Sequence, residues 1–200
     1  MLEHEKIKSM LEQCLSERRL RHSYGVAEEA YRLAKHYGAD AEKAYLAGLL
    51  HDCAKEIEPE ESLRLLREEY GIMPDAMSVQ TPRLLHGTLG ACIAQSKFEI
   101  YDPEILDAIR YHTTGKANMS LFSKIIYIAD YIEPTRDYED VDMLREMTYR
   151  SIDEAIIFGI DYTIRDLLEK RRTVHPDTVH CRNDLLVHKN AGTDLRKEPL

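Results

Sequence analysis

Hydrophobic residues along the chain recur mostly at intervals of three and four, which is the spacing of one face of an α-helix. Between residues 23 and 37 the apolar positions are Val26, Ala30, Leu33, Ala34 and Tyr37, and charged residues occupy the positions outside this stripe. The glycine that follows at position 38 is a typical helix stop. A convincing alternation of apolar and polar residues, which would indicate a β-strand, is not found along the sequence. The pattern therefore predicts an all-α protein.

The same spacing predicts nine further helices, separated by short turns. We expect them at residues 3–20, 41–51, 59–70, 86–98, 103–112, 120–131, 141–147, 151–170 and 176–188. The turns contain proline or glycine, as in Met73-Pro74-Asp75, but are too short and too poor in serine and glycine to be domain linkers. We therefore expect one compact helical domain over residues 1–189, followed by a polar tail over residues 190–200.

The composition narrows the class of protein. Of the 200 residues, 44% are hydrophobic, as is usual for a globular protein, and no apolar run approaches the ~20 residues of a membrane span. The charged N-terminus does not resemble a secretory signal, and the four cysteines form no CxxC pair. We expect a cytoplasmic protein that does not act at a membrane.

The net charge of −9 disfavours a nucleic-acid polymer as the partner, because such binding depends on clustered Lys and Arg. A small phosphorylated ligand stays compatible with this charge, since a few local cations can hold it. The sequence does not define the oligomeric state, and a homodimer is one expectation.

Six imidazole or carboxylate groups fall on apolar helix faces or at helix ends, where burial without a partner is costly. His51 and Asp52 end the apolar run Leu49-Leu50, and His22 precedes the stripe that begins at Val26. The others are His86, His112 and Asp130. A single inward histidine or aspartate usually has an ordinary hydrogen-bonding partner. Six together are better explained by shared cations, since few lysines or arginines are close in sequence.

Four imidazoles and two carboxylates suit Fe, Mn, Co, Ni or Zn, whereas Ca and Mg prefer oxygen ligands. The set is large enough for two metal ions, which Asp52 could bridge with its two oxygens. His51 and Asp52 are neighbours, so we expect them at a helix end where both can turn to one site.

The order His22, His51-Asp52, His86, His112, Asp130 resembles the signature of the HD-domain metal-dependent phosphohydrolases. The surrounding segments His51-Asp52-Cys53-Ala54-Lys55, Tyr111-His112-Thr113-Thr114-Gly115 and Ile128-Ala129-Asp130-Tyr131-Ile132-Glu133-Pro134 are similar to the YqeK branch of that superfamily. The resemblance extends from about His22 to Leu186 and implies a single helical HD-domain bundle.

The resemblance also implies an activity, symmetrical hydrolysis of diadenosine tetraphosphate to two ADP by a metal-activated hydroxide that attacks an inner phosphorus. It implies two divalent metal ions, iron first and Mn, Co or Ni as alternatives. His22, His51, Asp52 and Asp130 would hold one ion, and Asp52, His86 and His112 would hold the other.

Several further residues are candidates for catalysis or substrate binding. We expect Lys55 and Arg136 to act with Asp52 in catalysis and to bind phosphates. The alternatives are a solvated surface lysine for Lys55 and a surface ion pair with Asp137 or Glu139 for Arg136. The turn Thr113-Thr114-Gly115 offers hydroxyls and amides, and Lys116 is a weaker candidate. For the base we consider four tyrosines without choosing among them: Tyr101, Tyr111, Tyr127 and Tyr131.

Two alternative functions stay open. The same chemistry could act on an alarmone, a deoxynucleoside triphosphate or a nucleotide monophosphate. The domain could instead bind metal only to fold, or serve as a non-catalytic nucleotide sensor or docking module. Shared between two metals, the six ligands leave coordination positions open for water or substrate, which favours catalysis because structural sites are usually closed.

Overall fold

The computed structural model describes residues 4–194, with side chains through residue 188, and this part of the chain contains no β-strand. The helices are α1 (His4–Glu12), α2 (Glu17–Tyr37), α3 (Ala41–Leu50), α4 (Pro59–Arg64), α5 (Ala76–Gln80), α6 (Leu85–Phe98), α7 (Pro103–Tyr111), α8 (Leu121–Ile132), α9 (Val141–Arg150), α10 (Ile152–Glu169) and α11 (Pro176–Asp194). A π-helical turn (Leu65–Glu69) continues α4, and a short 3-10 turn (Pro82–Leu84) precedes α6. The all-α prediction is confirmed.

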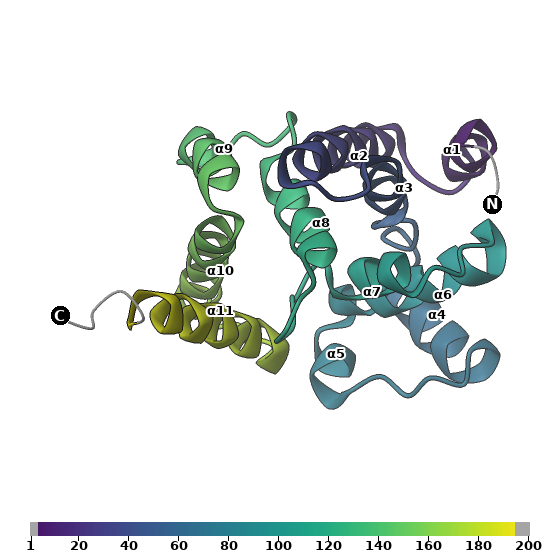
Figure 1. Ribbon diagram of the computed structural model, residues 1–200. Coiled ribbons are helices and arrows are strands. Elements are labelled where there is room, and N and C mark those ends of the chain that lie inside the picture. The colour runs from purple at the N-terminus through teal and green to yellow at the C-terminus, as the bar shows by residue number, and fades with distance from the viewer. Residues whose placement is uncertain (1–3, 195–200) are drawn as a thin grey trace, which may run out of the picture.

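Helix α8 is the central element of the arrangement. It contacts α2, α3 and α7 on one side and α9 and α10 on the other. In Figure 1 the teal to purple helices of the N-terminal part lie to one side of α8, and α9, α10 and α11 form a separate green to yellow group on the other. The order of packing thus places α8 between an N-terminal and a C-terminal group of helices.

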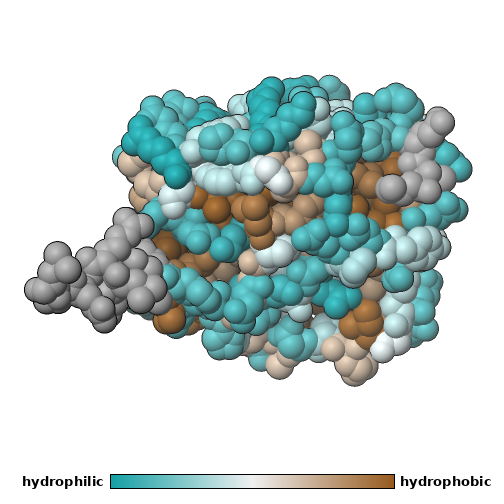
Figure 2. Space-filling view, in the orientation of Figure 1, coloured by the Kyte–Doolittle hydropathy of each residue, from teal (hydrophilic) through white to brown (hydrophobic). Residues whose placement is uncertain are grey.

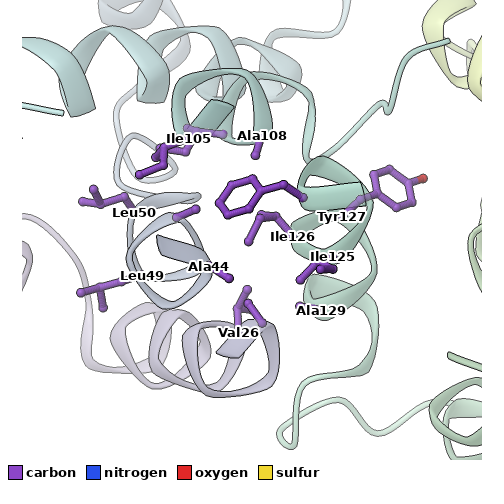
Figure 3. Close-up of a cluster of buried hydrophobic side chains, with 14 of the residues drawn as sticks. Val26, Ala44, Leu49, Leu50, Ile105, Ala108, Ile125, Ile126, Tyr127 and Ala129 are labelled. Atoms are coloured by element: carbon purple, nitrogen blue, oxygen red, sulfur yellow. The ribbon is translucent and has the colours of Figure 1, made fainter. Parts of the chain in front are cut away.

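The core is formed mainly where α2, α3, α7 and α8 meet. Figure 3 shows a cluster of buried side chains to which Val26 of α2, Leu50 of α3, Ile105 of α7 and Ile126 of α8 belong. Burial of side chains of this size stabilises the fold by about 1.5–3 kcal/mol each.

Two glycines allow neighbouring helices to approach closely. A Cβ atom at Gly48 of α3 would lie 2.8 Å from Ala27 Cα of α2, and one at Gly87 of α6 would lie 2.5 Å from the Arg110 carbonyl oxygen of α7. Atoms do not approach this closely in real proteins, so both helix pairs depend on the missing side chain.

The predicted single helix over residues 3–20 is wrong. The chain leaves the helix after Glu12, and α2 begins at Glu17 and continues without a break to Tyr37, so that His22 lies inside α2. Ser16 caps α2 through a hydrogen bond from the Arg19 amide, while its own amide and hydroxyl donate to Glu56 at 2.6 and 2.7 Å. A contact across 40 residues therefore decides this boundary.

Three smaller differences concern segments with little apolar pattern. The region 72–84, for which we predicted no helix, contains α5, which Asp75 caps by accepting hydrogen bonds from Met77 and Ser78. The predicted helix 59–70 is an α-helix followed by a π-helical turn. Helix α11 extends beyond residue 188 to Asp194, into the segment predicted as a tail, and residues 195–200 lie outside the described part.

The surface is mostly polar. Figure 2 shows hydrophilic residues over most of the visible face, with hydrophobic residues reaching the surface in a band across its middle. Within residues 4–194, no helix combines the length and the apolar character that crossing a membrane requires.

Candidate metal centre

The six polar residues singled out in the sequence lie together, although they come from five helices. His22 is in the second turn of α2, His51 and Asp52 directly follow α3, and His86 is the second residue of α6. The remaining two are His112, directly after α7, and Asp130, in the last turn of α8. The expectation that His51 and Asp52 sit at a helix end is confirmed, since α3 ends at Leu50.

One half of the cluster consists of His22, His51 and Asp130. His22 Nε2 lies 3.2 Å from His51 Nε2 and 3.1 Å from Asp130 Oδ1. His51 is completely buried and His22 nearly so, whereas Asp130 is partly accessible.

The other half consists of His86 and His112, whose Nε2 atoms are 3.0 Å apart. Asp52 joins the two halves. Its Oδ1 lies 3.2 Å from His86 Nε2 and 3.4 Å from His112 Nε2, while its Oδ2 lies 3.5 Å from His51 Nε2. The carboxylate that the sequence suggested as a bridge therefore lies between both pairs of imidazoles.

Hydrogen bonds fix the orientation of all four imidazoles. The Nδ1 atoms of His51, His86 and His112 donate to the carbonyl oxygens three residues earlier, at 2.6, 2.6 and 2.7 Å, and His22 Nδ1 donates to Glu133 at 3.0 Å. Because carbonyl and carboxylate oxygens can only accept hydrogen bonds, the Nδ1 atom must be the donor, and each neutral ring carries its proton there. All four Nε2 atoms thus turn a lone pair toward the centre, as in the outer shell of known metal sites.

The electrostatics of the cluster keep its carboxylates charged. Burial alone would raise the pKa of Asp52, but the imidazoles of His51, His112 and His86 hold it well below its usual range. Burial would also raise the pKa of Asp130, but the neighbouring His22, His51 and Arg136 side chains keep it very low. Burial lowers the pKa of His86 to about 4, so this ring is neutral at physiological pH.

This donor set fits divalent metal ions. Asp52 Oδ1 is buried and accepts no hydrogen bond within the described structure, and the Nε2 lone pairs of His86 and His112 face each other. Such an arrangement is costly unless a cation lies there. Two overlapping sets, His22, His51, Asp130 and His51, Asp52, His112, have ligand atoms within 4.8 Å of one another. Ligand atoms at right angles on one ion, with bonds of about 2.1 Å, are about 3.0 Å apart.

Cationic and hydroxyl groups surround the cluster. Lys55 Nζ lies 3.0 Å from His86 Nε2 and 3.6 Å from Asp52 Oδ1, and Thr113 Oγ1 lies 3.0 Å from His112 Nε2. Arg136 donates to the side chain and the carbonyl oxygen of Asp130. Lys55, Thr113 and Arg136 are thus beside the cluster, each with part of its side chain accessible.

Other predicted residues face elsewhere. Thr114 Oγ1 donates to the Gly115 carbonyl, and Gly115 has a φ of +64° at a point where an added Cβ would lie 2.7 Å from Cys181 Sγ. Lys116 Nζ pairs with Asp107 at 2.6 Å. Among the tyrosines, Tyr101 is 71% exposed in a different cavity and Tyr127 is buried in the core. Tyr111 lies under the Lys116 ammonium.

Two residues of the site were not found from the sequence. Glu133 is fully buried and accepts a hydrogen bond from His22 Nδ1, and the hydrogen bonds from His22 and Thr135 lower its pKa in spite of burial. Arg19 donates to Asp52 Oδ2 at 2.7 Å. The only signal was position: Arg19 is three residues before His22, and Glu133 is three residues after Asp130, which puts each about one helical turn from a candidate ligand.

A cavity of about 270 Å³ opens beside the cluster and is partly aromatic. It is lined by His112, Thr113, Asp130, Tyr131, Arg136, Tyr138, Tyr162 and Thr163. The rings of Tyr138 and Tyr162 are 5.9 Å apart, and Tyr162 is 43% exposed. Of the four tyrosines considered from the sequence, only Tyr131 lines this cavity.

Comparisons with known proteins agree with this geometry. The sequence profile of the HD domain matches residues 19–135. The chain is 41% identical over 175 residues to a symmetrical bis(5'-nucleosyl)-tetraphosphatase of Halalkalibacterium halodurans, covering 88% of this chain and 92% of that protein. It is 38% identical over 182 residues to the protein of the same name from Bacillus subtilis, covering 91% and 97%.

A solved structure is similar over almost the whole fold. It is a crystal structure of a predicted HD superfamily hydrolase involved in NAD metabolism from Clostridium acetobutylicum, with 40% identity and a TM-score of 0.91. The match covers 94% of this chain and 99% of that one. The chain therefore belongs to the HD domain family, in the branch that these relatives represent.

Proposed function

We propose that this protein hydrolyses diadenosine tetraphosphate symmetrically to two ADP with the help of two divalent metal ions. The observation that carries the proposal is the position of Asp52, whose two oxygens face two separate pairs of inward-turned imidazoles. The names of the relatives support the substrate, since two proteins at 38% and 41% identity are symmetrical bis(5'-nucleosyl)-tetraphosphatases.

His22, His51, Asp130 and Asp52 Oδ2 would hold one ion, and His86, His112 and Asp52 Oδ1 would hold the other. When bound, two such ions supply a hydroxide nucleophile at neutral pH and offset the negative charge of the polyphosphate. Iron is our first choice of metal, and Mn, Co and Ni suit the same mixture of nitrogen and oxygen ligands.

The chain's own cations would orient the polyphosphate. Lys55 lies on the His86 side of the cluster and Arg136 on the Asp130 side, so the two can contact phosphates on either side of the bond that breaks. The guanidinium group suits phosphate oxygens because it offers paired donors. Thr113 Oγ1, beside His112, can donate to a phosphate that lies between those contacted by Lys55 and Arg136.

Symmetrical cleavage requires attack on an inner phosphorus with ADP leaving, and therefore room for a nucleoside beside the centre. The cavity of Tyr131, Tyr138 and Tyr162 provides it, and the exposed ring of Tyr162 can stack on an adenine. Thr114, Gly115 and Lys116 make contacts away from this cavity.

The test is anaerobic reconstitution with Fe(II), and separately with Mn(II), followed by chromatography of the products from diadenosine tetraphosphate. We expect ADP alone. AMP together with ATP would place the attack on an outer phosphorus and contradict the proposal. Asp52→Ala should lose metal and turnover, whereas Asp142→Ala, at a side chain that is 90% exposed, should keep both.

Tight binding of the dinucleotide by the metal-loaded protein with no product over hours would instead favour a nucleotide sensor. The alternative phosphorylated substrates can be screened in the same assay. A cytoplasmic location and a homodimer are the remaining parts of the proposal, and light scattering tests the second.

A further inference from the structure

A second passage opens beside His86 of the metal centre and shares no lining residue with the tyrosine cavity. It is a cavity of about 220 Å³ whose lining includes Lys55, Arg83 and His86. His86 belongs to the centre, and the backbone of Arg83 holds its ring, because the Arg83 carbonyl accepts a hydrogen bond from His86 Nδ1 at 2.6 Å. The passage thus begins at the centre itself.

This passage continues into a larger cavity of about 580 Å³, because both share Pro59, Pro82 and Arg83 as lining residues. The larger cavity is also lined by Arg171 and Arg172, together with Gln80, Thr81 and Thr173. No acidic residue contributes to its lining among the residues described.

Among the residues whose side chains are described, the three arginines of this cavity have no ion-pair partner. Other arginines of the chain, such as Arg64 and Arg182, are held by carboxylates, but within residues 4–188 no carboxylate lies within 4.0 Å of the guanidinium groups of Arg83, Arg171 or Arg172. The chain carries 36 acidic and 27 basic residues, so three unpaired cations around one cavity stand against the overall charge. This arrangement favours an anionic ligand.

The backbone positions these side chains by contacts between two distant segments. Thr81 Oγ1 and Thr173 Oγ1 are 3.2 Å apart, and His175 Nε2 lies 3.4 Å from Asp75 Oδ1. The Arg172 amide donates to the Leu167 carbonyl at 2.7 Å, which holds the end of α10. The arginines thus lie on two segments that are joined to each other.

We propose that this arginine cavity binds the second nucleotide half of the substrate, and the proposal rests on the proposed function. A dinucleotide cleaved at its middle must extend from the metal centre in two directions, one nucleoside diphosphate half on each side. The tyrosine cavity with Arg136 receives one half. Lys55 and the three arginines receive the diphosphate of the other.

The smaller passage also contains two carboxylates, Glu56 and Glu58. Glu56 is turned to Ser16, whose amide and hydroxyl both donate to it, and these hydrogen bonds lower its pKa. Its charge is therefore already compensated. The anion is drawn instead to Lys55 at one end of the passage and the arginines at the other.

The test compares Arg171→Gln/Arg172→Gln with Arg67→Gln/Arg165→Gln. The control removes the same charge at two exposed arginines that line neither cavity. We expect the KM for diadenosine tetraphosphate to rise at least tenfold in the first variant and less than twofold in the control. Titration calorimetry with ADP on the metal-loaded protein should give two sites in the wild type and one in the first variant.

Retention of both ADP sites, or a KM equal to that of the control variant, would overturn the proposal. The calorimetric result does not require turnover, so it tests the arginine site separately from the proposed hydrolysis. If the wild-type protein makes no ADP from diadenosine tetraphosphate, but the arginine variant binds one ADP fewer than the wild type, the arginine site stands and the proposed reaction fails. If ADP forms, and the arginine variant keeps the wild-type KM and the wild-type number of ADP sites, the reaction stands and the arginine site fails.

Discussion

Glu133 lies fully buried beneath His22, with Oε1 3.0 Å from Nδ1 of the imidazole. Since this carboxylate fixes the proton on Nδ1, it also keeps the Nε2 lone pair of His22 directed at Asp130 and His51. Glu133→Gln removes the charge but almost no volume. We expect the affinity for the metals to fall about 10- to 100-fold, as is typical for outer-shell partners of histidine ligands.

The measurement is the metal content after dialysis against graded concentrations of a chelator. Glu139→Gln is the control, because Glu139 is exposed and outside the cluster. Equal metal retention in both variants would show that Glu133 has only a packing role.

Lys55→Met tests the assignment of Lys55 to the substrate rather than to the metals. We expect kcat/KM to fall about 10- to 100-fold, since a charge-assisted hydrogen bond contributes about 1.5–3 kcal/mol. Metal content should be unchanged. Steady-state kinetics and metal analysis on the same preparation give both numbers, with Lys97→Met, at an exposed lysine, for comparison. Loss of metal from the Lys55 variant would contradict this role.

Gly87→Ala should separate two helices that carry ligands. Its Cβ would lie 2.5 Å from the Arg110 carbonyl oxygen, and backbone cannot move aside as a flexible side chain can. We expect a loss of about 1–3 kcal/mol in the free energy of unfolding, together with weaker metal binding, because α6 carries His86 and α7 precedes His112. Denaturant unfolding and metal titration measure the two effects.

A matched change is Gly159→Ala in α10. There the new Cβ would meet the Tyr131 ring at 3.4 Å, an ordinary contact, and alanine favours the helix. This variant should be as stable as the wild type or more stable. A Gly87 variant that behaves in the same way would show that α6 and α7 can shift without cost.

Removal of metal should lower the thermal stability of the whole N-terminal part. A ligand that binds only the folded state at 100 times its Kd stabilises by about 2.7 kcal/mol, and here the ligands come from five helices. Calorimetry before and after chelation measures the shift in Tm. The same chelator should leave the Tm of Asp52→Ala unchanged, and a wild-type Tm that does not respond would contradict a metal-dependent fold.

The inner part of the site could be predicted from the sequence because its chemistry conflicts with its surroundings. Asp130 has apolar neighbours on nearly every side, and His51-Asp52 follows two leucines. Such a conflict is visible without a structure. The helical periodicity similarly defined most of the elements, since helices such as α2 and α7 bury one face.

The residues that surround the candidate ligands could not be predicted, because they belong to types that are ordinary on protein surfaces. Glu133 precedes a proline and resembles a turn residue, and Arg19 lies in a charged segment. The start of α2 depends on Ser16 meeting Glu56, which no local pattern contains. Tyr138 and Tyr162 lie on separate elements, so their shared cavity is a product of tertiary structure.

The matched HD segment ends at residue 135, whereas Arg136, Tyr138, Tyr162, Arg171 and Arg172 all follow it. Every proposed metal ligand thus comes before this boundary, and most groups that would recognise a nucleotide come after it. The chain is in this sense divided into a longer part that carries the metal ligands and a shorter part that carries most of the groups for nucleotide recognition. Exchange of the last 65 or so residues with those of a relative would be the shortest route to a new substrate, because it leaves the six ligands in place.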